Sequence, residues 1–205
     1  MAKTKTAPCK RAYSLGKRLE SSDQKRTKIL AAARVQLESN GFLGFTLDVL
    51  ARNSGVTRQT IHNLFGTKTG VLEALFDQLA LDGGVERMCS VMQQTNPAFM
   101  LASFVEIFSG FWGRDRLLIR RIHGIAAIDP EFGAVVDARN YRRKSAAARV
   151  IQMLGRHNGG QDAAQRSATL YALTSFEFFD ALSECCGSVD ECARVLLAIV
   201  EKAVS

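Results

Sequence analysis

Two short helical patterns separated by a turn at Gly55 constrain the fold of this chain more than any other feature. Thr46 and Thr57 each stand just before a run with helical spacing of apolar residues, where a threonine usually acts as an N-cap. Each threonine is also bracketed by the apolar pair of a hydrophobic staple: Phe45 with Leu50, and Val56 with Ile61. Because glycine lets two short helices cross within about four residues, the stretch 46–65 predicts a helix-turn-helix.

The second predicted helix, 57–65, has an apolar face and a polar face. At roughly 100° per residue, Ile61 and Phe65 fall on one side of the helix, while Gln59 and Asn63 fall together on the other. Carboxamide side chains offer the donor and acceptor pair that fits the major-groove edge of adenine. We therefore predict that Gln59 and Asn63 read DNA bases.

Other polar residues around this pair suit contacts to the DNA backbone. Arg58, near the start of the helix, can read guanine or hold a phosphate. Hydroxyl and imidazole groups at the edges of the helix suit phosphate oxygens, and three residues carry them: Thr57, Thr60 and His62. Lys68 lies in the first turn of the next predicted helix, where a cation opposes the helix dipole. A bound phosphate would reverse that penalty, and the alternative is a solvated lysine.

The run from about Gln24 to Leu81 resembles the DNA-binding domain of the TetR family of regulators. The matching pieces are the opening helix KILAAARVQLESNGF and the pattern T-x-x-x-L-A-x-x-S-G-V-T-x-x-T-I-x-x-L-F-x-x-K-x-x-V-L between Thr46 and Leu72. Two positions depart from the family pattern. His62 stands where a phosphate-contacting tyrosine is most common, and Gly70 stands where a glutamate is common.

The resemblance implies how the parts of the chain act. It implies base contacts from the helix 57–65, and backbone contacts from Thr46, from Lys68 and from the arm before the first helix. It also implies an effector pocket in a C-terminal helical bundle, a homodimer, and derepression when a small effector binds. No residue after about Leu81 can be matched to the family, because the C-terminal regions of its members diverge widely.

The charge of the chain is concentrated at its N-terminus. Residues 1–28 hold nine Lys or Arg against two acidic residues, an excess of +7 that equals the net charge of all 205 residues. Such a basic segment suits a polyanion such as double-stranded DNA, and the alternative is a solvated tail. We expect a basic arm over 1–21.

The rest of the chain predicts an all-α fold, because almost every break carries a helix start or stop and no stretch alternates with period two. Gly83 and Gly84 mark the predicted boundary between a DNA-binding domain, 22–82, and a helical ligand-binding and dimerisation domain, 83–205. The expected helices are 22–40, 46–54, 57–65, 67–82, 85–94, 97–112, 115–127, 129–155, 162–186 and 188–204. Gly187 is expected to end one helix, and Ser188 with Glu191 to cap the next.

Aromatic residues gather in two of the C-terminal helices. They indicate either a plain core or a cavity for an apolar or aromatic effector. The residues predicted for such a pocket are Phe104, Phe108, Trp112, His123, Tyr171, Phe176 and Phe179. Arg121 and Glu177 are further candidates for polar anchors.

The last predicted helix has more apolar surface than one face of a small bundle needs. Its candidate residues for a dimer interface are Val195, Leu196, Ile199 and Val200. Pairing of the last two helices of two copies would bury them, and a two-fold dimer fits a palindromic operator. The basic run Arg139, Arg142, Arg143 and Lys144 is interpreted as a solvated helix face.

Other functional classes find little support in the sequence. Its five cysteines are odd in number and lack paired CxxC spacing, which favours reduced thiols, although Cys185 and Cys186 could sense oxidants or soft metals. We find no catalytic motif, no metal-ligand spacing and no cofactor motif, and no apolar run long enough for a membrane span. We therefore expect a cytoplasmic regulator without cofactor. The alternatives are a non-specific DNA-binding architectural protein and, more remotely, a helical enzyme.

Overall fold

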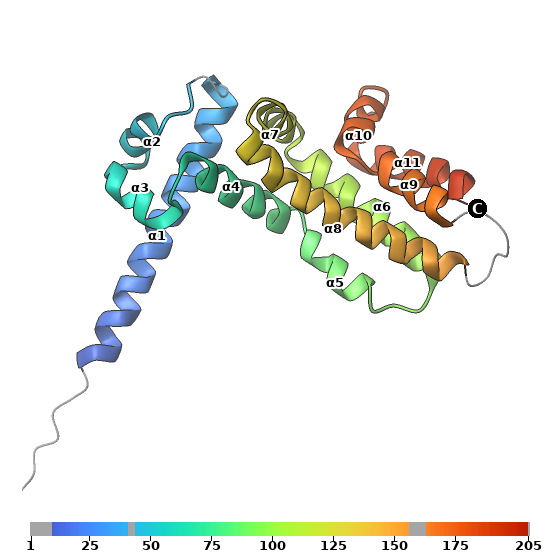
Figure 1. Cartoon of the computed structure of the whole chain (residues 1–205), viewed down its shortest axis with the longest axis horizontal. Coiled ribbons are helices and arrows are strands. Elements are labelled where there is room, and N and C mark those ends of the chain that lie inside the picture. The colour runs from blue at the N-terminus through green and yellow to red at the C-terminus, as the bar shows by residue number, and fades with distance from the viewer. Residues whose placement is uncertain (1–9, 41–43, 156–162, 205) are drawn as a thin grey trace, which may run out of the picture. The chain divides into compact units, whose positions relative to one another are not determined.

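The computed structural model describes residues 10–40, 44–155 and 163–204, and within them it contains helices and no strands. The all-α prediction is confirmed (Figure 1). The helices are α1 (Lys10–Asn40), α2 (Leu47–Ser54), α3 (Arg58–Phe65), α4 (Lys68–Asp82), the 3-10 turn η1 (Val85–Arg87), α5 (Met88–Val91), α6 (Pro97–Arg114), α7 (Arg116–Ile128), α8 (Pro130–Gly155), α9 (Ala163–Leu173), α10 (Phe176–Ser183) and α11 (Val189–Val204).

The chain forms two compact units, Met1–Val71 and Leu72–Ser205. The division falls inside α4, whereas the sequence suggested a boundary near Gly83. The helix α1 begins at Lys10, so part of the expected basic arm is helical. None of the described helices has both the length and the apolarity of a membrane span.

The predicted caps form the helix-turn-helix of the N-terminal unit. The Thr46 hydroxyl accepts a hydrogen bond from Val49 N at 3.3 Å, and the Thr57 hydroxyl accepts one from Thr60 N at 3.1 Å. Gly55 ends α2 with φ of 67°, a left-handed conformation that glycine adopts without strain. These local bonds set the start of α2, the turn and the start of α3.

A second close turn joins α3 to α4. Gly66 ends α3 with φ of 73°, and the Thr67 hydroxyl accepts a hydrogen bond from Gly70 N at 3.0 Å. A Cβ atom at Gly70 would overlap with Phe65 O, far inside van der Waals contact. The turn between α3 and α4 therefore has no room for a side chain at Gly70, a position where the family commonly has glutamate.

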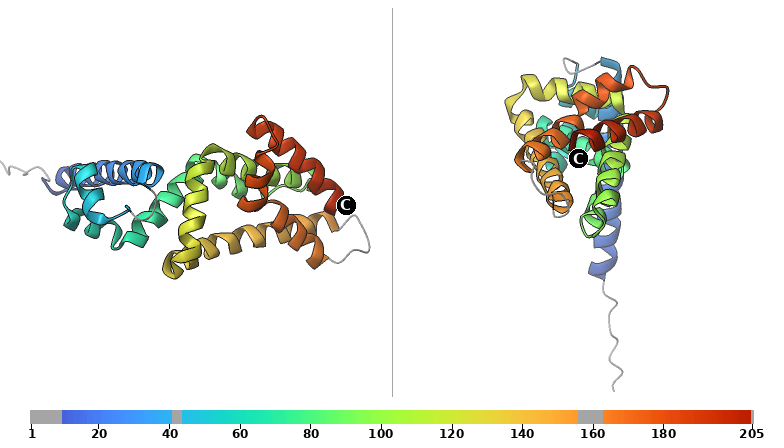
Figure 2. Two further views of the ribbon diagram at one scale, coloured as in Figure 1. Left: turned by 90° about the horizontal axis from the view of Figure 1, so that it is seen from above. Right: turned by 90° about the vertical axis from the view of Figure 1, so that its right-hand side faces the viewer.

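The C-terminal unit consists of helices packed around an apolar core. Within it α8 packs on α9 and α7, and α6 packs on α11 (Figures 1 and 2). Two helices start with an N-cap residue followed by proline: Asn96 accepts from Phe99 N at 3.2 Å, and Asp129 accepts from Phe132 N at 3.2 Å. The aromatic stripe of α6 lies inside this core, since Phe104 is fully buried and Phe108 is 7% exposed.

The expected helix 162–186 is wrong in one respect, because it is divided into α9 and α10. The hydroxyl of the fully buried Thr174 donates to Leu170 O, and the Ser175 hydroxyl accepts from Phe178 N as the N-cap of a new helix. The first expected residue, Asp162, lies outside the described residues. The helix-ending role of Gly187 is also wrong, because α10 ends earlier, at Ser183. Ser188 does cap α11, accepting from Glu191 N at 3.1 Å.

The interpretation of the basic run on α8 as a solvated face fails for Arg143, which is 5% exposed. Its guanidinium donates to Tyr171 O at 2.6 Å, near the C-terminal end of α9. Arg166, also 5% exposed, donates through Nε to Val204 O at 2.8 Å, at the end of α11. Each buried cation therefore lies where a helix dipole is negative and unsatisfied carbonyl groups need donors.

Candidate nucleic-acid interface

One face of α3 is exposed and polar. Arg58, Gln59, His62 and Asn63 are exposed, while Ile61, on the opposite face, is 1% exposed. The helix has eight residues, and its apolar side fixes it in the N-terminal unit. The residues predicted to contact DNA bases thus lie on the same accessible surface.

Gln59 and Asn63 are bonded to each other. Gln59 Nε2 donates to Asn63 Oδ1 at 2.8 Å, as the i, i+4 spacing on a helix allows. The bond leaves Gln59 Oε1 as an acceptor and Asn63 Nδ2 as a donor on the exposed face. This arrangement is complementary to the N6 donor and N7 acceptor of adenine.

The residues at the edge of α3 make local contacts. The hydroxyls of Thr57 and Thr60 lie 2.9 Å apart, and Thr57 also caps the helix. Arg58 Nη1 lies 3.4 Å from Asp48 Oδ1, in a pair whose side chains are both more than three-fifths exposed. An exposed ion pair of this kind is weak, so Arg58 can exchange Asp48 for a phosphate at small cost.

Lys68 and Arg26 lie over aromatic rings of the same unit. Lys68 Nζ is 5.7 Å from the centroid of Phe45, and the Arg26 guanidinium carbon is 4.8 Å from the centroid of Phe65. The role of Arg26 was missed in the sequence, where it counted only as one charge of the basic segment. No local spacing could have indicated it, because Phe65 is distant in the chain.

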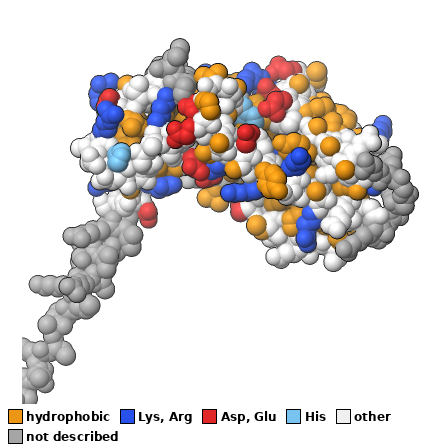
Figure 3. All heavy atoms as spheres, in the orientation of Figure 1, with side chains coloured by type: hydrophobic (Ala, Val, Ile, Leu, Met, Phe, Trp, Pro, Cys, Tyr) orange, Lys and Arg blue, Asp and Glu red, His pale blue; other side chains and the backbone are white. Residues whose placement is uncertain are grey.

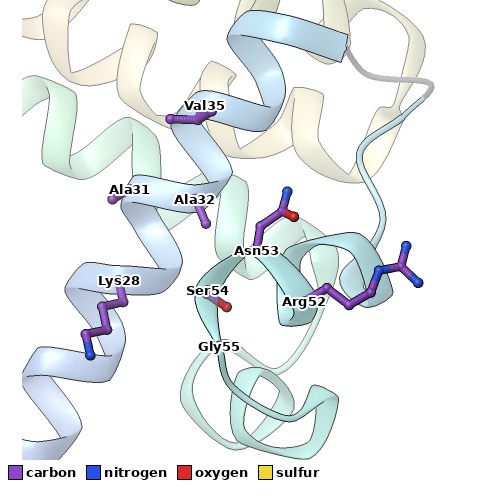
Figure 4. Close-up of a pocket in the computed structure, with 8 residues that line it drawn as sticks. All are labelled: Lys28, Ala31, Ala32, Val35, Arg52, Asn53, Ser54 and Gly55. Atoms are coloured by element: carbon purple, nitrogen blue, oxygen red, sulfur yellow. The ribbon is translucent and has the colours of Figure 1, made fainter.

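An open groove of about 680 Å³ lies between α1 and α2. Figure 4 shows Lys28 on α1 and Arg52 on α2 at opposite ends of the groove, so their charges do not converge on one point. The other residues that line the groove are Ala31, Ala32, Val35, Asn53, Ser54 and Gly55.

In the C-terminal unit, five rings form a ring cluster, made of Phe76, Phe111, Trp112, His123 and Phe176. The centroid distances are 4.4 Å for Phe111 to Trp112 and 4.7 Å for His123 to Phe176. Three of the predicted pocket residues therefore meet: Trp112, His123 and Phe176. Phe108 joins them through Trp112 at 6.1 Å and contacts Phe104 at 4.9 Å.

The other two predicted pocket residues lie apart from the ring cluster. Tyr171 packs against Arg143, with the guanidinium 4.0 Å from the ring centroid. Phe179 is fully buried on α10 and approaches Gly113 of α6. The buried indole nitrogen of Trp112 donates to Thr174 O at 3.1 Å, which ties α6 to the break between α9 and α10.

A row of ion pairs joins α7 to α10 beside the ring cluster. Arg120 donates to both carboxylate oxygens of Asp180, at 2.9 Å and 2.8 Å. His123 Nδ1 lies 2.9 Å from Glu177 Oε1, and this hydrogen bond lowers the pKa of Glu177 to about 2. The sequence indicated only His123 and Glu177 of this row. The other members look like ordinary surface charges in the sequence: Arg116, Arg120, Asp180 and Glu184.

The four residues proposed for a dimer interface divide into two sets. Leu196 is 1% exposed and Val200 is fully buried within the chain itself, so their apolar surface is already covered. Val195 is 39% exposed and Ile199 is partly exposed. Figure 3 shows hydrophobic side chains gathered over α10 and α11 on the face in view. A groove of about 270 Å³ also runs between α6 and α11.

The described thiols do not form a metal site. In the described parts of the chain, no group of three or more His, Cys, Asp or Glu side chains is placed to hold a metal ion. Burial raises the pKa of the Cys192 thiol to about 12, which makes it a poor nucleophile. Cys185 is exposed, and Cys9 lies outside the described residues.

Comparison with known proteins finds a family match for one segment of the chain. Residues 29–75, which run from α1 into α4, match the model described as bacterial regulatory proteins of the tetR family. Residues 29–75 are thus similar to the N-terminal segment of TetR-family regulators. The resemblance recognised between about Gln24 and Leu81 is thereby confirmed.

The named proteins to which this chain is similar are regulators. A segment of 114 residues is 30% identical to the HTH-type transcriptional regulator EthR of Mycolicibacterium smegmatis, and it covers 55% of this chain and about half, 52%, of that relative. A TetR transcription regulator from Haloarcula marismortui has a similar fold, with a TM-score of 0.68 and 17% identity over 89% of this chain and 97% of that one.

A transcriptional regulator from Saccharomonospora viridis, solved in complex with choline, has a TM-score of 0.66 and 21% identity over 86% of this chain and 95% of that one. Both structural likenesses extend beyond the matched DNA-binding segment and into the C-terminal helices. At these identities they show that the fold is shared.

Proposed function

We propose that this TetR-type protein is a sequence-specific transcriptional regulator that binds a palindromic operator as a homodimer and leaves it when a small apolar or aromatic effector binds. The observation that carries the proposal is the bonded amide pair of Gln59 and Asn63 on the exposed face of α3, in a domain of the TetR type. A fixed donor and acceptor on a recognition helix suits direct reading of base edges.

The residues divide into base readers and phosphate binders. Gln59 and Asn63 read bases, and Arg58 reads guanine or holds a phosphate. The phosphate binders lie around them, at helix starts and edges: Thr46, Thr57, Thr60, His62 and Lys68. The basic arm 1–21 adds affinity without specificity, because phosphate neutralisation releases counterions from any sequence.

The C-terminal domain, 83–205 in this proposal, supplies the effector site and the dimer contact. The ring cluster supports an aromatic or apolar ligand, since its neighbours are rings from several helices. The exposed apolar residues of α11 support a two-fold contact, with Val195 and Ile199 at its centre. The choline complex of a structurally similar regulator supports a small-molecule ligand for this fold. A cytoplasmic location fits a protein that works on DNA.

The test compares the operator with scrambled DNA. The DNA upstream of the gene and its neighbours is the first source of operator fragments, and binding is measured at a fixed salt concentration for both DNAs. A sequence-specific regulator should prefer the operator by about a thousandfold or more. Equal affinity for both DNAs would instead favour a non-specific architectural protein.

A further inference from the structure

His123 brings a polar ring into the ring cluster. Its side chain is 15% exposed, and its Nε2 atom is buried with no hydrogen-bond partner among the residues that the structure describes. Leaving a buried polar atom without a partner costs about 1–3 kcal/mol, so such atoms are uncommon in folded proteins. A ligand group that bonds Nε2 would remove this cost.

The charge of Glu177 determines whether His123 Nε2 donates or accepts a hydrogen bond. The Glu177 carboxylate lies 2.9 Å from His123 Nδ1, and with its pKa lowered to about 2 it is ionised at neutral pH. An ionised carboxylate only accepts hydrogen bonds, so the proton of the neutral imidazole must be on Nδ1. His123 Nε2 then carries a lone pair, and it accepts a hydrogen bond from a donor on the ligand.

The neighbours of the imidazole are aromatic. Its centroid lies 4.7 Å from that of Phe176, and it meets Trp112 and Phe76 edge-on at 5.9 Å and 6.5 Å, with interplanar angles of 89° and 86°. Edge-on and offset contacts are the favourable geometries for aromatic pairs. A flat ring can therefore replace one of these contacts with a similar one.

The buried cation Arg143 favours a neutral donor group on the ligand over a cationic one. Arg143 donates to Thr174 Oγ1 at 3.2 Å, and the carbonyl of the same Thr174 accepts from Trp112 Nε1 at 3.1 Å. The guanidinium is therefore one residue away from the ring cluster, and it also interacts electrostatically with Glu177. Arg143 thus already offsets the negative charge of Glu177. Like charges repel strongly where the dielectric constant is low, so a second cation is unfavourable here. A hydroxyl on an aromatic ring supplies a polarised proton without a positive charge.

We infer that the effector is an aromatic compound with a phenolic hydroxyl, which donates to His123 Nε2 while its ring packs beside Trp112 and Phe176. The inference rests on the proposed function, because it names the ligand class of the same C-terminal site. The short helix α10 carries both Phe176 and Glu177 and is joined to α7 by side-chain ion pairs.

The experiment uses the full chain without DNA and three probes: para-phenylphenol, its methyl ether and choline. Trp112 is the chain's only tryptophan, so its fluorescence reports binding at this site. At about pH 8 the phenol should bind about fivefold to tenfold more tightly than the ether, as expected for one net hydrogen bond. Choline should not change the Trp112 emission.

Two variants test whether His123 and Glu177 cause the preference for the phenol over the ether. His123→Phe keeps an aromatic ring and removes the lone pair, so the phenol and the ether should bind equally. Glu177→Gln permits the other tautomer and should reduce the preference, whereas Glu106→Gln, an exposed carboxylate on α6, should leave it unchanged.

Four results would overturn the inference: equal binding of phenol and ether to the parent, a preference retained in His123→Phe, tighter binding of choline, or no binding of any probe. None of these results bears on operator recognition. Gel-shift measurement of the ligand-free protein tests that part of the proposed function separately.

Discussion

At the residue scale, Gln59 and Asn63 hold each other in one arrangement, so each amide is oriented before DNA arrives. Gln59→Ala or Asn63→Ala should remove a base contact of about 1–3 kcal/mol and relax base preference at one or two positions per half-site. Non-specific binding should remain nearly intact. Selection of binding sites from random DNA measures this, and unchanged preferences at every position would show that α3 reads no bases through these residues.

Lys68→Ala is the contrast to those variants, because Lys68 is proposed to hold a phosphate rather than a base. It should weaken binding to all sequences similarly. The slope of log affinity against log salt concentration should fall by about one unit for each phosphate that the variant no longer neutralises. A change in sequence preference instead would contradict the assignment.

Gly70 lies in a turn that has no room for a Cβ atom. The Cβ of Gly70→Ala would overlap with Phe65 O, and a backbone oxygen cannot move away as a flexible side chain can. We expect a loss of more than about 1 kcal/mol in the free energy of unfolding, measured by urea denaturation. Gly110→Ala on α6 is the matched control, because a Cβ there meets no atom within 4 Å. This control should be neutral or stabilising by up to about 1 kcal/mol.

At the element scale, Arg143 connects α8 to the C-terminal end of α9 and to Thr174 at the break that follows. Arg143→Met keeps an apolar stem but leaves Tyr171 O without this donor. The variant should lose about 1.5–3 kcal/mol in the free energy of unfolding, as for a hydrogen bond to a charged group. Arg142→Met, the exposed neighbour on the same helix, should change stability by less than about 0.5 kcal/mol. Equal losses would show that Arg143 is not a structural link.

The pairing of α7 with α10 predicts a pH dependence. The pKa of Glu177 falls from an ordinary 4.5 to about 2, chiefly through the hydrogen bond from His123. A carboxylate whose pKa is lowered by folding stabilises the fold at pH values above its pKa in the unfolded chain. This stabilisation is lost as the pH falls through its pKa in the folded chain. The melting-temperature difference between the parent and Glu177→Gln should therefore persist down to about pH 4.5 and close toward pH 2.

The size of that difference should be small, because the Glu177 side chain is 70% exposed and solvent screens the pair. Exposed pairs contribute about 0.2–1 kcal/mol. A difference that grows steadily as the pH falls from neutral to 2 would show that the hydrogen bond from His123 is not the origin of the low pKa of Glu177.

At the scale of the whole molecule, the proposed dimer depends on the apolar residues of α11 that remain exposed. Val195→Glu should place charge in the interface and shift the protein toward monomer at micromolar concentration, measured by sedimentation. Operator affinity should fall with it. Leu196→Ala should behave differently, because Leu196 is buried in its own chain and its loss leaves a cavity costing about 2–5 kcal/mol. A Val195→Glu protein that stays dimeric would place the interface elsewhere.

Features that depend on neighbouring residues follow from the sequence alone. Thr46, Thr57 and Asn96 cap helices because the cap and the amide it bonds are three residues apart, and Gly55 turns the chain through its own φ. The TetR-type domain could be recognised for the same reason, since its pattern is a series of such local requirements. The exposed face of α3 also follows from helical periodicity.

Features that depend on residues distant in the chain could be known only from the packed helices. Arg143 is buried, although its neighbours in the sequence indicate a solvated face, because the end of α9 supplies its acceptors. His123 meets Trp112 and Phe176 only after three helices pack together. Leu196 and Val195 differ in burial although they are adjacent and both apolar, because only packing determines which side of α11 faces the core. Local spacing specifies caps and faces, but the partner of a buried charge or ring is set by packing.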